Sequence, residues 1–223
     1  MSKRLIMILA LAFVVGMAFA AYAEVQNVKV GGDITAYAIG KSQFGLNKDA
    51  TLKNESAFAS VVKVKVDADL TDNVMTTVAL LNERYWGTED SSNHNTTIDL
   101  ALAFVTLKEF LYSPLTMMVG MQELHFGNDM IVGDPDTNNR VNSKSAFNTS
   151  QPGDAGLSAR KGFDAIRANL NYDPLVMDLV YAKVDENGLT NTDDVNLYGI
   201  NAGYKIDDAT RAEAYYWKKD TQK

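Results

Sequence analysis

Charged residues alternate with aliphatic residues over residues 60–70, and this stretch carries the clearest chemical pattern in the sequence. Lys63, Lys65, Asp67 and Asp69 fall on one side of an extended strand, with valine, alanine and leucine on the other side. Charged residues at comparable places in other strand-like stretches are Asp33, Glu83, Asp99, Arg167, Arg211 and Glu213. If the aliphatic side contacts lipid, these charges face inward and predict the wall of a water-filled channel that discriminates among ions and sugars. The competing interpretation is that they only solvate the wall or pair across strands.

Residues suited to catalysis are few. The only histidines are His94, in a polar stretch, and His125, near the end of a strand-like stretch, and neither has sequence neighbours that complete a triad or a metal cluster. The motifs of serine hydrolases, zinc proteases, P-loop proteins and dinucleotide-binding proteins are absent. Because the chain has no Cys, thiol nucleophiles, disulfides and Cys-ligated metals are excluded as well. We therefore expect neither an enzyme nor a cofactor.

A weak candidate for a metal site lies at Asp134, Asp136 and Asn138, which resemble the start of a calcium-binding loop. Asn139 stands where an EF-hand requires Gly, and Ser145 occupies the place of its bidentate Glu. Asp-Pro and Asn-Asn are also ordinary turn sequences, so we expect a turn here rather than a bound metal.

The composition narrows the class of protein. The 223 residues include 21 Lys and Arg against 28 Asp and Glu, a formal net charge of -7, and no basic cluster, which argues against nucleic-acid binding. With 46% hydrophobic residues, the chain is too apolar for general disorder. A chain of this length fits a single domain.

Residues 1–23 have the layout of a signal peptide. Lys3 and Arg4 precede an uncharged apolar run, and the small residues Ala21 and Ala23 stand just before the first acid, Glu24. The competing interpretation is an uncleaved membrane anchor, but the strongly hydrophobic part ends near residue 15, which is short for a span. We expect cleavage, export and a mature domain over residues 24–223, in which no other stretch is apolar enough for a membrane helix.

Alternation with a period of two continues along the chain and predicts about nine strands. Their ranges are 28–39, 60–70, 74–85, 98–108, 115–126, 163–172, 175–184, 195–206 and 210–217. Both sides of 115–126 carry apolar residues, so we assign neither side to a channel. The connections at 40–57, 86–97, 127–161 and 185–194 are long and polar, and those between them are short turns. This asymmetry is typical of an antiparallel transmembrane up-and-down β-barrel, with short turns at one rim and long loops at the other.

Aromatic residues gather near the ends of the predicted strands. They are Tyr85, Trp86, Phe110, Tyr112, Phe126, Phe163, Tyr172, Tyr204, Tyr216 and Trp217. We expect them to form aromatic girdles at the two membrane interfaces, with ordinary packing at strand ends as the alternative.

The predicted number of strands is odd, whereas single-chain bacterial barrels close with an even number. The last predicted strand also runs directly into Lys218 and Lys219 rather than ending on an aromatic residue. We therefore expect the chain to be the N-terminal part of a barrel of roughly 16 to 18 strands, incomplete at its C-terminus. The alternative is closure with about eight strands, which would require one predicted strand to be wrong.

The segment 120–133 reads G-M-Q-E-L-H-F-G-N-D-M-I-V-G. It resembles the signature of the alginate-export family of outer-membrane porins, with Gly120, Gln122, Gly127 and Gly133 at matching positions. The succession of strands, turns and loops over residues 26–217 is similar to that family. The resemblance implies a large outer-membrane barrel that exports or admits acidic polysaccharides and small polar solutes.

Two positions depart from this signature. Met121 and Met130 stand where the family often carries Arg, so two cations that would pair with uronate carboxylates are missing. The sequence therefore favours a passive pore for small polar solutes or oligosaccharides over dedicated alginate export. We expect its partners to be outer-membrane lipid and these solutes, and the residues leave the oligomeric state open.

The long connection 127–161 invites a further hypothesis. Ordered loops of this length usually have a role of their own. We expect this connection to fold into the pore and to narrow it.

A soluble alternative is a secreted or periplasmic β-sandwich that binds carbohydrate, with exposed aromatics such as Trp86 and Trp217 as stacking platforms. A sandwich buries its apolar sides between two sheets, whereas a barrel exposes them to lipid. The charges of residues 63–69 and the alternating connection lengths favour the barrel.

Overall fold

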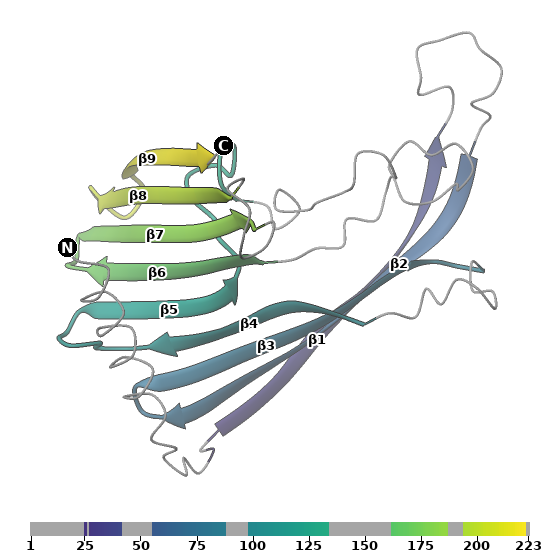
Figure 1. Cartoon of the computed structure of the whole chain (residues 1–223), viewed down its shortest axis with the longest axis horizontal. Helices are drawn as coiled ribbons and strands as arrows, with labels where there is room; N and C mark the ends of the chain where they lie inside the picture. Colours follow the sequence, from purple (N-terminus) through teal and green to yellow (C-terminus); the bar gives the residue numbers. More distant parts are fainter. Residues whose placement is uncertain are drawn as a thin grey trace, which may run out of the picture.

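The computed structural model describes residues 25, 27–41, 55–87, 98–133, 162–186 and 194–221, so the predicted signal peptide lies outside the described part. In these residues the chain forms one antiparallel sheet of nine strands, each paired with the next along the sequence. Figure 1 shows the strands side by side in a strongly twisted sheet. Across the described ranges, no helix is long and apolar enough to cross a membrane.

Every predicted strand is present. The strands are β1 Asn27–Lys41, β2 Glu55–Thr71, β3 Val74–Tyr85, β4 Asp99–Leu107, β5 Leu115–Gln122, β6 Phe163–Asn171, β7 Leu175–Asp185, β8 Val195–Lys205 and β9 Arg211–Thr221. β5 ends four residues earlier than predicted because the chain leaves the sheet after Gln122. β9 continues past the predicted end at residue 217 because it pairs with β8 as far as Thr221.

The register sorts the side chains into two faces, because directly paired residues on neighbouring strands point to the same side of a sheet. Lys63 of β2 pairs with Asp33 of β1 and with Leu81 of β3, and such rows continue to β9. We call the side that carries Lys63 the polar face and the opposite side the apolar face. All predicted wall residues share the polar face: Asp33, Lys63, Lys65, Asp67, Asp69, Glu83, Asp99, Arg167, Arg211 and Glu213.

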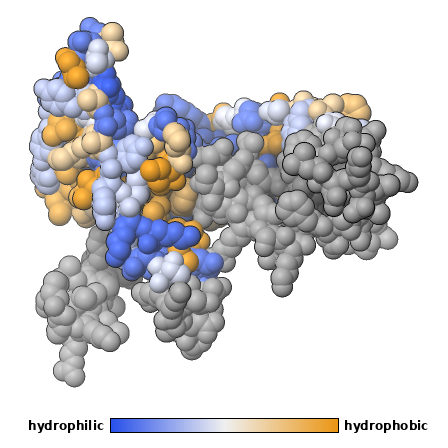
Figure 2. Space-filling view, turned by 90° about the horizontal axis from the view of Figure 1, so that it is seen from above, coloured by the Kyte–Doolittle hydropathy of each residue, from blue (hydrophilic) through white to orange (hydrophobic). Residues whose placement is uncertain are grey.

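Aliphatic and aromatic side chains dominate the apolar face, and many of them are open to the surroundings. The exposed fraction is 70% for Val30, 77% for Ile34 and 52% for Ile200. Figure 2 shows hydrophobic residues, in orange, at the surface in the left part of the view. On a soluble protein, an apolar surface that extends across so many strands would be an aggregation hazard.

The polar face also carries buried apolar side chains, which form two clusters among the described residues. One cluster lies on β2, β3 and β4 and includes Val61 and Leu81. The other joins Phe163 and its neighbours on β6, β7 and β8 to Phe126, with Trp217 of β9 packed against it. The predicted girdle role is therefore wrong for Phe126, Phe163 and Trp217, because these side chains pack on the polar face of the sheet.

The described sheet is open. Its strand order runs from β1 to β9, so these two strands are its edges and do not pair with each other. The expected all-β antiparallel meander is confirmed, and the described residues do not form a closed barrel.

Candidate functional site

After β5 the chain leaves the sheet and crosses its polar face. We call residues 123–133 the crossing segment. In Figure 1 its teal trace runs from the end of β5 past β6, β7 and β8 toward β9. It contacts β2 through Glu123 and β9 through Gly127. The start of the predicted inward loop thus lies against the polar face, whereas residues 134–161 are outside the described part.

Gln122 fixes the point at which the crossing segment departs. Its side chain is 2% exposed, and its amide Nε2 donates to the carbonyl oxygens of Met118 at 3.2 Å, Gly120 at 3.4 Å and Ala165 at 3.1 Å. Gly120 has a φ of +123°, and a Cβ there would stand 2.3 Å from the carbonyl oxygen of Ala103 on β4. Two residues of the signature thus shape the end of β5. Gln122 supplies a buried amide, and Gly120, which has no side chain, lets the backbones of β5 and β4 approach closely.

Two polar contacts hold the crossing segment to distant strands. Lys63 Nζ donates to Glu123 Oε1 at 2.9 Å, and the Gly127 N–H donates to Glu213 Oε1 at 3.1 Å. Gly127 has a φ of +63°, and a Cβ there would stand 2.9 Å from a ring carbon of Tyr215. Glycine is therefore required both by the backbone conformation and by the space available. The predicted wall residues Lys63 and Glu213 position the crossing segment.

Phe126 anchors the middle of the crossing segment. Its ring centroid lies 4.9 Å from that of Trp217, with the ring planes inclined by 50°. The guanidinium carbon of Arg167 lies 5.1 Å from the same centroid, a cation–π contact. The Phe126 N–H donates to the Val132 carbonyl at 3.0 Å and closes this part of the segment into a loop. An apolar anchor and two polar contacts thus hold the segment on the sheet.

Arg167 also belongs to a charged network on β6 and β7. Its Nε donates to Asp178 Oδ1 at 2.8 Å, and Asn169 Nδ2 donates to the same oxygen at 2.8 Å. Asp178 is only 4% exposed, so its carboxylate needs these donors to compensate for the loss of water. The network keeps one predicted cation, Arg167, neutralised at the sheet surface.

The predicted charges of β2 are paired but accessible. Lys65 Nζ lies 3.1 Å from Asp67 Oδ2, and their side chains are 43% and 29% exposed. Thr77 Oγ1 donates to the other oxygen of Asp67 at 2.6 Å. Asp69 accepts a hydrogen bond from Asn27 Nδ2 at 3.2 Å. These groups present paired charges of both signs to the space above the polar face.

A cavity of 120 Å³ lies between the crossing segment and strands β1–β4. Asp33, Lys63 and Glu123 supply its charged lining, and Val61 and Leu81 are among its apolar residues. The volume is large enough for several waters or one small polar group, since a water needs about 10–15 Å³ of such space. The cavity therefore gives polar molecules a place beside the Lys63–Glu123 ion pair.

The remaining predicted wall residues lie on three strands of the polar face. Glu83 is on β3, Asp99 is on β4 and Arg211 is on β9. The Arg211 guanidinium lies over Gly203, where a Cβ would stand 2.4 Å from Nη2. They extend the charged part of the polar face onto β3, β4 and β9.

The other motif and candidate residues have local roles or fall outside the description. Gly133 lies so close to Asp129 that a Cβ would stand 2.2 Å from the Asp129 Cβ. The weak metal candidates Asp134, Asp136 and Asn138 lie outside the described residues. Within the described ranges, no group of three or more His, Asp or Glu side chains could hold a metal ion.

Sequence reasoning missed two partners at this site, Glu123 and Asp178. Asp178 could have been predicted from the short turn at 172–174. A hairpin with this turn pairs Asp178 with Asn169, which points to the same face as Arg167 two residues earlier. Glu123 gave a weaker signal. Its partner Lys63 lies 60 residues earlier in the sequence, on a strand that is not a neighbour of β5 in the sheet.

Comparison with known proteins leaves the function open. Neither a scan against protein-family models nor a search of curated proteins found a match to this chain. The resemblance of residues 120–133 to alginate-export porins therefore remains a prediction.

Proposed function

We propose that this chain forms part of the wall of a channel in the outer membrane, through which small polar solutes or oligosaccharides pass passively. The observation that carries the proposal is the division between the two faces. The polar face holds the predicted wall charges and the crossing segment, whereas the opposite face exposes side chains such as Ile34 and Val30. An outer-membrane barrel has this arrangement, with an apolar exterior and a polar lumen.

The length of the apolar part of strands β6–β9 supports a position in a membrane. On β6–β9 a polar row crosses this face near the long connections, and its members are Asp164, Lys183, Asn196 and Asp220. The next rows toward the short turns are apolar except for Lys218. From Asn196 to Lys205 the strand extends about 31 Å, which at a tilt of about 40° projects to about 23 Å. This is close to the apolar band of about 25 Å in outer-membrane barrels.

Tyrosines flank the apolar rows at both ends, as interfacial side chains do. Tyr181 and Tyr198 form a row next to the polar one, with ring centroids 5.3 Å apart. At the opposite end, the hydroxyl oxygens of Tyr112 and Tyr172 lie 3.3 Å apart, and Tyr204 is also exposed there. The hydrogen bond with Tyr172 raises the pKa of Tyr112 above its usual value. These bands fit the two membrane interfaces and include residues predicted for the girdles.

The crossing segment supports a narrowed channel. Its contacts with Lys63 and Glu213 join β2 to β9 across the polar face, so the segment occupies space that a lumen would otherwise leave to water. We propose that it sets part of the constriction, as expected for the connection 127–161.

Closure of the barrel requires further strands. Because neighbouring strands of the described sheet are antiparallel, β1 and β9 run in the same direction. An odd number of additional strands would pair antiparallel with both edges and give the even total that bacterial barrels have. We therefore propose that these strands belong to a barrel of roughly 16 to 18 strands.

The charges favour small polar solutes over long polyanions. Lys63, Lys65 and Arg167 are each paired with a carboxylate in the described part. Neutralised cations attract an acidic polysaccharide less strongly than a free arginine row would. Met121 lies on the apolar face, opposite Ala103 and Asp164, so an Arg at that position would not reach the lumen in any case. Export of acidic polysaccharide remains the narrower version of the proposal, carried by the family resemblance alone.

The β-sandwich alternative needs a second sheet on the apolar face. The described residues supply one sheet, and the layer over its polar face is the crossing segment. The apolar face thus lacks, within the described part, the covering that a soluble sandwich requires.

The proposal is tested by conductance of the complete barrel, with the further strands that closure requires, refolded in detergent and inserted into planar bilayers. We expect stable steps that neutral and acidic oligosaccharides block to similar extents. Asp69→Asn should shift the reversal potential toward anion passage, because it removes a wall carboxylate, whereas Lys218→Gln on the apolar face should not. A chain that folds without detergent and gives no conductance would overturn the proposal.

A further inference from the structure

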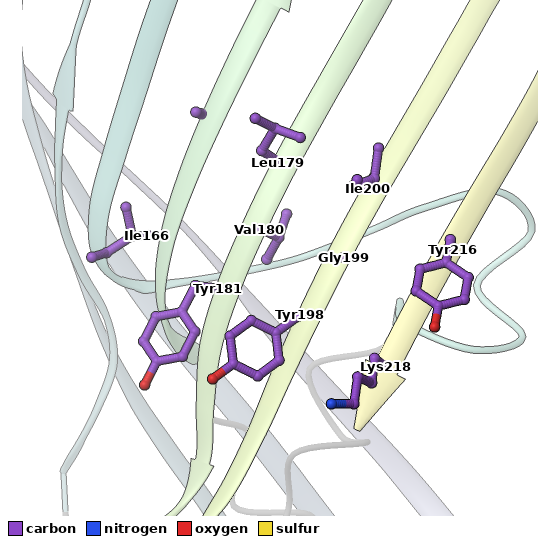
Figure 3. A pocket seen from close by; sticks show the side chains of 10 residues that line it. Ile166, Leu179, Val180, Tyr181, Tyr198, Gly199, Ile200, Tyr216 and Lys218 are labelled. Atoms are coloured by element: carbon purple, nitrogen blue, oxygen red, sulfur yellow. The ribbon is translucent and has the colours of Figure 1, made fainter. Parts of the chain in front are cut away.

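A groove of 440 Å³ lies on the apolar face across β6–β9. Its walls are two neighbouring rows of side chains. Tyr181, Tyr198 and Lys218 belong to the row nearer the long connections, and Leu179 and Ile200 to the next row. Figure 3 shows the Tyr181 and Tyr198 rings pointing away from Leu179 and Ile200, which opens the space between the rows.

The interior of the groove suits hydrocarbon. Leu179, Ile200 and Ile166 expose 45%, 52% and 44% of their surfaces there. Ala168, at the β6 end, is too short to fill it. Extended hydrocarbon matches such a surface, whereas a polar ligand would lose its hydrogen bonds with water.

One end of the groove is cationic. Lys218 ends the tyrosine row on β9, opposite Tyr198, and its side chain is 57% exposed. Its contact in the described part is Asp220 Oδ1 at 3.4 Å, an exposed pair that a stronger anion can displace. The Tyr181 hydroxyl, by contrast, is engaged with Asn196 Oδ1 at 3.0 Å. The groove therefore joins an apolar body to a positive end beside the polar row.

We propose that this groove binds one acyl chain of an anionic membrane lipid, whose phosphate contacts Lys218. The proposal rests on the proposed function, since the groove meets lipid only if the apolar face lies in a membrane. The shape selects a lipid over a free anion, because most of the groove offers only hydrocarbon contacts. The site would keep one lipid in place longer than the rest of the apolar surface does.

Native mass spectrometry of the full chain, released from detergent micelles with added phosphatidylglycerol, tests the site. We expect one lipid to be retained per chain, with weaker retention of phosphatidylcholine that has the same acyl chains. Lys218→Gln should weaken phosphatidylglycerol retention about five-fold, the effect of one cation near an anionic lipid surface. Lys219→Gln is the matched control, because Lys219 pairs with Leu197 on the polar face.

A second pair of variants tests the apolar part. Ala168→Phe should fill the groove and lower retention of both lipids, whereas Ala202→Phe, on the same face outside the groove, should not. Equal losses for Lys218→Gln and Lys219→Gln, or equal retention of both lipids by the unaltered chain, would overturn the inference. Insertion into vesicles is measured in parallel, so that a chain that inserts without this preference contradicts only the lipid site. Failure to insert contradicts the proposed function as well.

Discussion

Gly199→Ala is expected to dislodge Trp217 and loosen the crossing segment. Gly199 of β8 pairs with Trp217 of β9, and the indole lies directly over the glycine. A Cβ at Gly199 would stand 1.8 Å from Trp217 Cζ3 and 2.1 Å from its Cε3. Ordinary carbon contacts lie near 3.5 Å, so the ring would have to withdraw by about 1.7 Å. It would lose its packing on Phe126, 4.9 Å away between centroids.

Overpacking of this kind costs about 1–3 kcal/mol in free energy of unfolding. With a urea dependence of about 2 kcal/mol per molar, a loss of about 2 kcal/mol lowers the unfolding midpoint by about 1 M. The assay is urea unfolding of the lipid-folded chain, followed by Trp217 fluorescence in a Trp86→Phe background. Trp86 stacks on Phe58 at 5.6 Å, and phenylalanine keeps an aromatic ring there. We also expect Trp217 emission to shift to the red as its ring leaves the cluster.

Gly31→Ala is the matched control, because it makes the same chemical change on the polar face of β1. A Cβ at Gly31 has nothing within 4 Å. Its effect should stay within about 0.5 kcal/mol, apart from a small gain from reduced freedom of the unfolded chain. Equal midpoints and equal emission for the two variants would refute the reasoning about Trp217.

Three further outcomes are expected. Asp178→Asn should lower the free energy of unfolding in urea by about 2–3 kcal/mol, because it leaves Arg167 without its carboxylate partner and the Arg167 side chain is only 22% exposed. A midpoint equal to that of the unaltered chain would contradict this. Glu213→Gln should weaken the contact with the Gly127 N–H and increase open-channel current noise, and unchanged noise would argue against a role for that contact in the constriction. Asp207, in the last short turn, has a lowered pKa because its carboxylate accepts a hydrogen bond from the backbone N–H of Ala209. Its contribution to stability is therefore present above the unfolded pKa and is lost as pH falls through the lower folded pKa. Asp207→Asn should therefore flatten the acid limb of a stability-against-pH curve, and an unaltered limb would count against the turn contact.

The strands and their faces could be predicted because both follow from local alternation. In β2 the charges at 63, 65 and 67 oppose valines at 62, 64 and 66, and pairing with β1 and β3 preserves that division. Two of the hairpins, β2–β3 and β6–β7, followed from their short turns, since strands joined by two or three residues pair as hairpins.

The crossing segment could not be predicted in detail because it depends on contacts far apart in sequence. Phe126 packs against Trp217, which only the folded sheet brings near. Both residues are aromatic and lie near strand ends, so local pattern could not distinguish the membrane interface from a buried cluster. The end of β5 depends on the same tertiary contact, since Leu124 and Phe126 are buried by crossing the sheet rather than by extending it.

If the polar face meets water while the apolar face meets lipid, thiol labelling along β2 will distinguish the two faces. The chain has no Cys, so Val64→Cys, Lys65→Cys, Val66→Cys and Asp67→Cys each introduce a single thiol. In liposomes, a charged maleimide should label positions 65 and 67 and spare 64 and 66. A lipid-borne quencher should act on a fluorophore at 64 and 66 only. Equal aqueous labelling at all four positions, in a chain that is folded and membrane-bound, would contradict this division between a wet and a lipid-facing side.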